Sequence, residues 1–393
     1  MFATIFAIHY DARGWLGWAL WNIYRLLPVL VNVSYFYKAY RLWINQDEDN
    51  TTAAVIVASM WGFTEASLRI TVIEGRYRSL SKLMCFLNVR TYCPVDAPRV
   101  HRQRAALFDR NNRIILLLVG TMLLQALWFM TTQLFNRDAF MLQLNGKVVQ
   151  NAGVQITYGL LSNIWGMIHV LPFGLLYITM NIFELEMKII LEAVTNLETT
   201  LTKYLRTFHK SRLQVGESSC EEQKVFWDII QQELNKHISR HVDLLDNLRE
   251  YSLIVGPFAF VQYYGTFALI ADCGFILSIE GLSSNSFIYI LFATVLVFES
   301  FLICRGIEKL NGLNEAIGQA LYTGFDWPGL LQYTDGFRSQ YQSVRHSLLL
   351  IIGRSQKGFQ CSYGGLGGIS MERFAQLMQN SYSLLTILLQ FAK

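Results

Sequence analysis

The sequence predicts an all-α membrane protein with seven transmembrane helices. Of its 393 residues, 52% are hydrophobic, 14% are aromatic and only 16% are charged, whereas soluble domains carry roughly 25% charged residues. The apolar residues fall in blocks of about 20, which is the length that a helix needs to cross a bilayer. The net charge of +4 is too small to indicate a nucleic-acid partner, and none is expected.

The blocks with few charges give the positions of the spans. The run at 2–8 is short and lacks basic residues before it, so it does not predict a signal peptide. The stretch Ser347–Gly353 is too short to cross a bilayer and lies between Arg345 and Arg354, so we expect a helix packed against protein. The seven predicted spans lie near 16–40, 53–72, 114–134, 160–183, 251–277, 287–304 and 371–392.

The loops differ in Lys and Arg content, which predicts orientation. The connection between spans three and four contains only two basic residues, Arg137 and Lys147, and the connection between spans five and six contains no Lys or Arg. Nine cations lie between spans two and three, namely Arg76, Arg78, Lys82, Arg90, Arg99, Arg102, Arg104, Arg110 and Arg113. We therefore expect a cytoplasmic N-terminus and an extracellular C-terminus. This orientation argues against a heptahelical G-protein-coupled receptor, whose N-terminus is extracellular.

The same orientation predicts the organisation of the chain. Within 184–250, apolar residues recur every four positions from Leu185 to Leu201, which predicts a helical extension in the cytoplasm. The predicted parts are helices one to four (1–183, with basic loop 73–113), the cytoplasmic extension (184–250), helices five and six (251–304), a cytoplasmic anchor region with a short apolar helix (305–370) and the terminal helix (371–393).

The sequence offers no catalytic or metal-binding pattern with interpretable spacing, so we expect no enzyme, cofactor or metal. None of the six cysteines falls in a clearly extracellular loop, and Cys85 and Cys93 lack a second pair for zinc. Charges inside spans are costly. We interpret Arg25 as snorkelling to the membrane boundary, and Asp272 and Glu299 as marking wet or subunit-facing surfaces. No inverted repeat supports a transporter.

The C-terminal third carries the most specific pattern. It contains Ala320-Leu321-Tyr322 with Trp327 after it, Arg354-Ser355-Gln356-Lys357, the glycine-rich run 364–368, Phe374, and a last helix with Ser381-Tyr382-Ser383 before Thr386-Ile387-Leu388-Leu389. This order resembles the C-terminal region of insect odorant receptors. Leu384 and Leu385 depart from the aromatic that many members carry there. Insect gustatory receptors are the alternative: Gln390-Phe391 matches the end of their signature, while Ser383-Leu384 replaces its Thr-Tyr start.

The resemblance implies a tuning subunit of a tetrameric, ligand-gated, non-selective cation channel. Such a subunit would pair with the odorant co-receptor in a heterotetramer, in the plasma membrane of olfactory sensory neuron dendrites, and a small volatile odorant would open the channel directly. A gustatory receptor would conduct without that co-receptor, and a transporter would show saturable uptake.

The terminal helix is the candidate pore lining. Ser383, Ile387 and Gln390 recur at spacings of four and three, so they share one face. A polar stripe with one apolar position suits a pore that gates by dewetting. The resemblance makes Ile387 the candidate gate and Gln390 a polar ring beyond it; the alternative is an ordinary lipid-facing helix.

The resemblance places the ligand among the outer halves of spans two, three, four and six. We predict contacts from Met60, Trp61, Trp128, Trp165, His169, Tyr289 and Phe292. Phe63, Phe129, Met167 and Phe287 lie in the same halves. Trp128, Trp165, His169 and Tyr289 are preferred, because each adds a hydrogen-bonding tip to an apolar body. The alternative for each residue is ordinary packing between helices.

Overall fold

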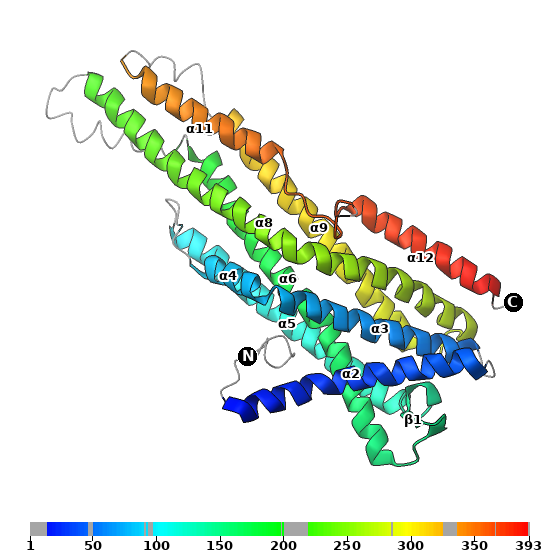
Figure 1. The fold of residues 1–393 in the computed structure, drawn as a ribbon. Helices are drawn as coiled ribbons and strands as arrows, with labels where there is room; N and C mark the ends of the chain where they lie inside the picture. Colours follow the sequence, from blue (N-terminus) through cyan, green and yellow to red (C-terminus); the bar gives the residue numbers. More distant parts are fainter. Residues whose placement is uncertain are drawn as a thin grey trace.

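The computed structural model describes residues 14–45, 50–89, 92, 97–197, 199, 219–283, 286–324, 336–365 and 367–391, and these are almost entirely helical (Figure 1). Helical structure suits apolar segments, because it pairs backbone N–H and C=O groups within each segment. The long helices are α2 (Gly14–Asn45), α3 (Asn50–Gly75), α5 (Ala97–Thr132), α6 (Ala152–Thr195), α8 (Ser219–Glu280), α9 (Phe287–Thr323), α11 (Arg338–Gln356) and α12 (Met371–Phe391); α4 (Tyr77–Asn88) and the 3₁₀ turn η1 (Asp138–Phe140) are short.

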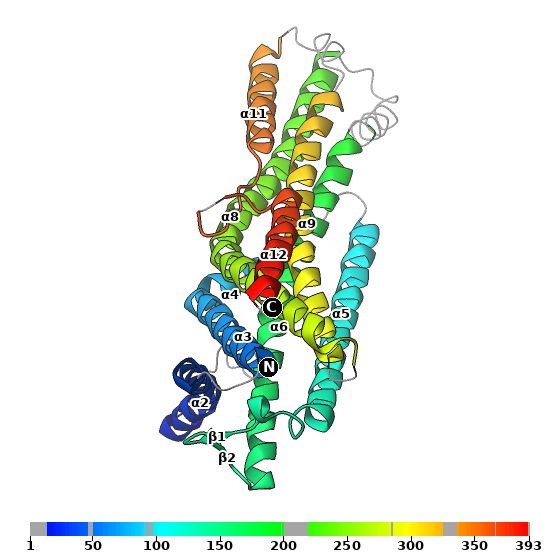
Figure 2. The same ribbon diagram turned by 90° about the vertical axis from the view of Figure 1, so that its right-hand side faces the viewer.

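The helices run lengthwise in an elongated bundle with two different ends (Figures 1 and 2). We call one end the anchor end; it contains α11, the first half of α8 and the last turns of α6 and α9. The opposite end, the hairpin end, contains the turn between α8 and α9 and the β-hairpin that precedes α6. Helix α12 lies against α8 and α9. The stretch Ser347–Gly353, predicted to be a helix packed against protein, lies within α11, and its Leu348 and Ile351 are buried.

Five of the described helices have the length and apolar composition of a membrane span, namely α3, α5, α6, α8 from Gln223 onward, and α9. Helices α2 and α12 are not among these five, although predicted spans 16–40 and 371–392 fall on them. The count of seven spans therefore stays a prediction.

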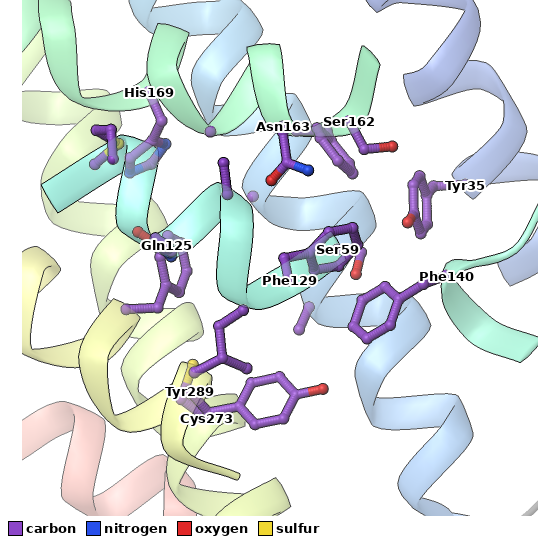
Figure 3. A pocket seen from close by; sticks show the side chains of 18 residues that line it. Tyr35, Ser59, Gln125, Phe129, Phe140, Ser162, Asn163, His169, Cys273 and Tyr289 are labelled. Atoms are coloured by element: carbon purple, nitrogen blue, oxygen red, sulfur yellow. The ribbon is translucent and has the colours of Figure 1, made fainter. Parts of the chain in front are cut away.

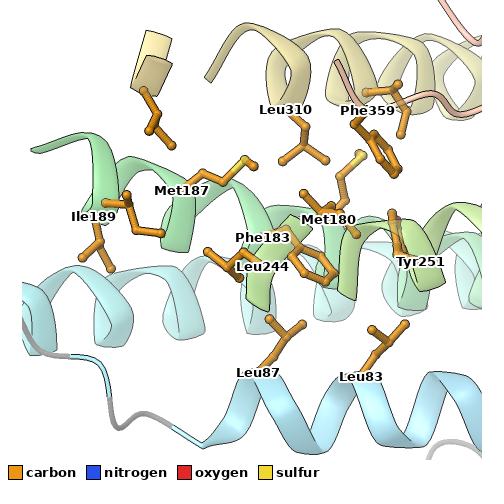
Figure 4. Close-up of a cluster of buried hydrophobic side chains, with 14 of the residues drawn as sticks. Leu83, Leu87, Met180, Phe183, Met187, Ile189, Leu244, Tyr251, Leu310 and Phe359 are labelled. Carbon is orange, nitrogen blue, oxygen red and sulfur yellow. The ribbon is translucent and has the colours of Figure 1, made fainter. Parts of the chain in front are cut away.

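Most buried apolar side chains form one core toward the anchor end (Figure 4). In this core, Leu83 and Leu87 of α4 face Phe183 of α6, with Tyr251 of α8 beside them. Trp227 in the first half of α8 is only 1% exposed. Two smaller clusters lie elsewhere, one joining α3, η1, α8 and α9 and one joining α2, α3 and α6.

A two-residue hairpin closes the connection between α5 and α6. Strand β1 (Gln143–Leu144) pairs antiparallel with β2 (Lys147–Val148). Both turn residues have positive φ, 51° at Asn145 and 78° at Gly146, which is the type I′ geometry favoured by an Asn-Gly sequence. The side chain of Gln155 in α6 fixes the hairpin base: its Oε1 accepts from the Leu142 N–H at 2.7 Å, and its Nε2 donates to the Val149 carbonyl at 2.8 Å.

The predicted break before the last helix lies in the segment that joins α11 to α12. Ser362 and Gly368 form an isolated bridge there, and the φ values of Gly364, Gly365 and Gly367 are all positive. Glycine adopts such values without steric cost. Some predicted features lie outside the described residues: Cys93, Leu201, Trp327 and the side chains of Arg25, Trp165 and Met167.

Candidate ligand-binding site

A cavity opens between the helices in the half of the bundle nearer the hairpin end (Figure 3). Its volume is about 180 Å³. Its lining comes from α2, α3, α5, η1, α6, α8 and α9, namely Tyr35, Ala58, Ser59, Gly62, Phe63, Met122, Gln125, Ala126, Phe129, Phe140, Ser162, Asn163, Gly166, His169, Cys273, Ile288, Tyr289 and Phe292. A mostly apolar lining with a few polar groups is typical of a small-molecule site.

Small residues on the helices leave room for the cavity, and aromatic rings form much of its border. On α3, Ser59 lies three residues before Gly62 and four before Phe63, and Ala58 lies four before Gly62, so these residues share one face. A Cβ added at Gly62 would meet only one Leu269 atom within 4 Å, at 3.9 Å, and one added at Gly166 would meet nothing within 4 Å. Glycine at these positions therefore leaves open space in this part of the bundle.

Two polar groups of the lining are buried and have no hydrogen-bond partner among the described residues. These are the Tyr289 hydroxyl and Nε2 of His169; the two side chains are 8% and 3% exposed. The His169 ring also contacts the Phe292 ring, with centroids 5.7 Å apart. Because an unpartnered buried polar group is costly, these two atoms are suitable anchors for a polar group on an otherwise apolar ligand.

The structure brings together part of the predicted set. His169, Tyr289 and Phe292 line the cavity, as do Phe63 and Phe129. Met60 packs instead against the cluster around Val31 and Tyr35. Trp61 and Trp128, which are 41% and 37% exposed, lie outside the lining, and the Trp128 ring sits 5.9 Å from that of Phe287.

Sequence reasoning missed several residues of the lining. Tyr35 and Phe140 come from α2 and η1, which were not considered as walls of the site. Gln125 and Asn163 are uncharged polar residues within apolar helices, and this signal could have found them, because polar side chains inside a membrane segment usually face protein or water.

A polar hollow lies next to the cavity at the hairpin end, lined by Thr51, Thr52, Val55, Asn136, Arg137, Asp138, Ala139 and Glu280. The Arg137 guanidinium donates twice to the Glu280 carboxylate, at 2.5 Å on each side. It also lies 5.7 Å from the centroid of the Tyr289 ring. Tyr289 thus separates the cavity, which it lines, from an ion pair in this hollow.

One prediction about charged residues is wrong. Glu299 does not mark a wet or subunit-facing surface, because it is 1% exposed and its Oε2 lies 2.8 Å from Nη1 of Arg69. Arg69 and Glu65, both on α3, form a second buried ion pair that sequence reasoning also missed. Asp272 is half-buried. Among the described residues, no group of three or more His, Cys, Asp or Glu side chains is arranged to hold a metal ion.

Helix α12 presents two different faces. Leu377 and Ser381 are buried at 1% exposure each, on the side that packs against α8 and α9. The predicted pore residues Ser383, Ile387 and Gln390 are all exposed, Ile387 at 48%. In the single chain these three side chains form an uncovered stripe of polar and apolar character.

Comparison with known families decides what kind of protein carries this site. The family model described as 7tm Odorant receptor matches residues 52–382, which is most of the chain. This chain belongs to the odorant receptor family. The family is one of receptors and not of enzymes. Together with the long apolar helices, membership makes the receptor a multi-pass membrane protein.

Individual relatives are more distant. Odorant receptor 85f from Drosophila melanogaster is 24% identical over 155 residues, and that match spans 39% of this receptor and 37% of the relative's length. The insect olfactory receptor OR5 from Machilis hrabei, solved in complex with eugenol, superposes with a TM-score of 0.68 at 12% identity, covering 99% of this chain and 96% of that one. A second structure of OR5 gives a TM-score of 0.65 at 11% identity, with the same coverage of both chains. These matches establish a shared fold.

Proposed function

We propose that this receptor is a tuning subunit of a ligand-gated, non-selective cation channel that works with the odorant co-receptor in a heterotetramer. The observation that carries the proposal is the cavity: a mostly apolar space with two buried, unpartnered polar atoms, in a chain of the odorant receptor family. Its ligand is a small, mostly apolar volatile molecule with one polar group, because the lining offers aromatic surface and few hydrogen-bonding anchors. His169, Tyr289 and Phe292 are the proposed contacts from the predicted set.

The proposed topology has seven spans, with the N-terminus in the cytoplasm and the C-terminus outside. The hairpin end is then extracellular and the anchor end is cytoplasmic. The proposed parts of the chain are 1–183, 184–250, 251–304, 305–370 and 371–393. Exposed leucines such as Leu116 and Leu117 of α5, at 78% and 69%, support contact with lipid along this face. The receptor is proposed to act in the dendritic membrane of olfactory sensory neurons.

The proposed pore is formed by α12 from each of four subunits. Its support is the uncovered stripe of Ser383, Ile387 and Gln390 on the face turned away from α8 and α9. A ring of isoleucines at Ile387 would gate by excluding water, with Gln390 as a polar ring beyond it. An Ile387→Ala channel should therefore leak more in the absence of ligand.

Electrophysiology in a heterologous cell tests the proposal. The receptor is expressed with and without the co-receptor, and currents are recorded during a panel of volatiles that includes eugenol, other small phenols, aromatic alcohols, ketones and terpenes. We expect evoked currents that carry Na⁺ and K⁺ similarly and that require the co-receptor. Currents from this chain alone would favour a gustatory-type channel. Saturable uptake without current would favour a transporter, and dependence on a G protein would contradict direct gating.

A further inference from the structure

A buried guanidinium ties three helices together beside the cavity. Arg69 of α3 is completely buried. Its Nη1 donates to Glu299 Oε2 of α9 at 2.8 Å and to the His169 carbonyl of α6 at 3.0 Å. Its Nε and Nη2 donate to Glu65 Oε1, one turn earlier on α3, at 3.0 and 2.5 Å. One side chain therefore contacts α6, α9 and its own helix at the same time.

The cluster extends to a fourth helix. Nε2 of Gln262 in α8 donates to Glu299 Oε2 at 3.2 Å and lies 3.5 Å from the Ser300 hydroxyl. The Phe258 ring of α8 lies 5.4 Å from the Arg69 guanidinium carbon. Replacing a buried ion pair by apolar residues is often neutral or stabilising. Stability alone is therefore a weak reason for this arrangement, and a role in function is the better explanation.

His169 joins one side of the cluster to the cavity. His169 turns its imidazole into the cavity lining and its backbone carbonyl toward Arg69. Nε2 of this imidazole is one of the two buried polar atoms without a partner among the described residues. A ligand that hydrogen-bonds there acts on the residue whose carbonyl also holds the guanidinium.

The other side of the cluster reaches the start of α12. Two residues after Glu299, the Phe301 ring contacts the Phe374 ring of α12 at a centroid distance of 5.7 Å. Further along α9, Glu308 Oε1 accepts from the Met371 N–H at 2.7 Å. Helix α9 therefore carries both the acidic partner of Arg69 and two contacts that hold the first turn of α12.

We propose that the Arg69–Glu299 ion pair is a positioning unit that transmits ligand occupancy of the cavity to the base of α12. The proposal rests on the function proposed above. Arg69 has two buried carboxylate partners, one on its own helix and one on α9. Of these two partners, only Glu299 joins α3 to another helix, whereas Glu65 lies on the same helix as Arg69. Making or breaking this one link between α3 and α9 gives the discrete alternative arrangements that coupling between sites requires.

The two glutamates form a matched pair of test positions. Glu299→Gln removes the charge that links α9 to α3, whereas Glu65→Gln removes the charge that stays within α3. Each receptor is co-expressed with the co-receptor, its surface density is measured by biotinylation, and currents are evoked by the most active compound of the volatile panel. Binding is read separately, as thermal stabilisation of the purified receptor complex by the same compound.

We expect Glu299→Gln to lower the maximal evoked current per surface receptor by about tenfold, within the usual range of coupling energies, with little change in the compound concentration needed for stabilisation. Glu65→Gln should retain most of the current. Equal loss of current in both variants, or full current in Glu299→Gln, would overturn the coupling role. If Glu299→Gln does not reach the surface, Gln262→Met replaces it and the same two readouts decide. Absence of any evoked current in the unaltered receptor would instead contradict the proposed function itself.

Discussion

The two ends of this receptor are packed differently. At the anchor end, α4, α6, α8, α9 and α11 share one large core whose side chains are almost all below a tenth exposed. Around the cavity, the buried apolar residues divide into two small clusters, and Gly62 and Gly166, which have open space beside them, line the cavity. Closely packed cores resist change, whereas a region with internal space can accommodate a ligand and rearrange. We therefore expect the anchor end to determine stability and the cavity region, as the proposed ligand site, to determine the response.

Truncation at the anchor end should produce the largest effect. Trp227→Ala removes a side chain that is 1% exposed and contacts the rings of Phe226 and Tyr341. A loss of about 3–5 kcal/mol is expected for a buried Trp, so thermal unfolding in detergent should shift strongly downward and surface density should fall. Trp61→Ala is the control, since Trp61 is 41% exposed and lies outside both the core and the cavity lining. Equal effects of the two variants would contradict the contrast between the ends.

Acidification should also weaken the anchor end. His237 lies in the charged first half of α8, outside the predicted span 251–277, and its Nδ1 accepts from the Tyr92 hydroxyl at 2.7 Å when the ring is neutral. Burial lowers the pKa of His237 to about 4. The unfolded chain, with a pKa near 6.5, then binds more protons than the folded chain between these values. The resulting stability is present above pH 6.5 and is lost as the pH falls toward 4.

Protonation of His237 should lower the free energy of unfolding by about 3 kcal/mol, because each pKa unit corresponds to about 1.4 kcal/mol. Thermal unfolding of the purified receptor between pH 7 and 4 measures it. His237→Gln, which keeps a hydrogen-bond acceptor for Tyr92 and does not titrate, should flatten the pH dependence. An unchanged slope in that variant would show that His237 is not the group responsible.

A change in the cavity should alter response without altering stability. Tyr289→Phe removes a hydroxyl that has no partner in the described part of the chain, so the thermal unfolding temperature should change little. For an active compound with a hydroxyl or carbonyl group, loss of one hydrogen bond worth about 1 kcal/mol raises the half-maximal concentration about fivefold. The unaltered receptor and the Tyr289→Phe receptor should respond equally to an apolar analogue of the compound. A Tyr289→Phe receptor that responds normally to every polar compound would exclude this hydroxyl as an anchor.

The sequence predicts the helices well and their faces less well. Long apolar blocks identify α3, α5, α6, α8 and α9, because length and composition alone determine whether a helix can span a membrane. Trp61 and Trp128 were grouped with His169 and Tyr289, yet only the latter two line the cavity. The rotation of a mostly apolar helix relative to its neighbours is set by packing, and a sequence without a clear polar face does not reveal it.

Contacts between distant segments were equally hidden. Arg69 and Glu299 are 230 positions apart, and nothing in either helix alone indicates that they meet. Glu65 and Arg69, four residues apart at the inner part of a predicted span, could have been recognised as an ion pair on one helix face. The β-hairpin could also have been predicted from the sequence, since Asn145-Gly146 is a strong turn signal.

Filling the cavity tests whether an odorant acts there. Gly166 lines the cavity, and a Cβ there meets nothing within 4 Å; Gly120 of α5 has equally open surroundings but lies outside the lining. The measurement is the evoked current per surface receptor for Gly166→Leu and for its matched control Gly120→Leu, each with the co-receptor. We predict that Gly166→Leu loses the response while Gly120→Leu retains it. An unchanged response in Gly166→Leu at normal surface density would show that the odorant acts elsewhere.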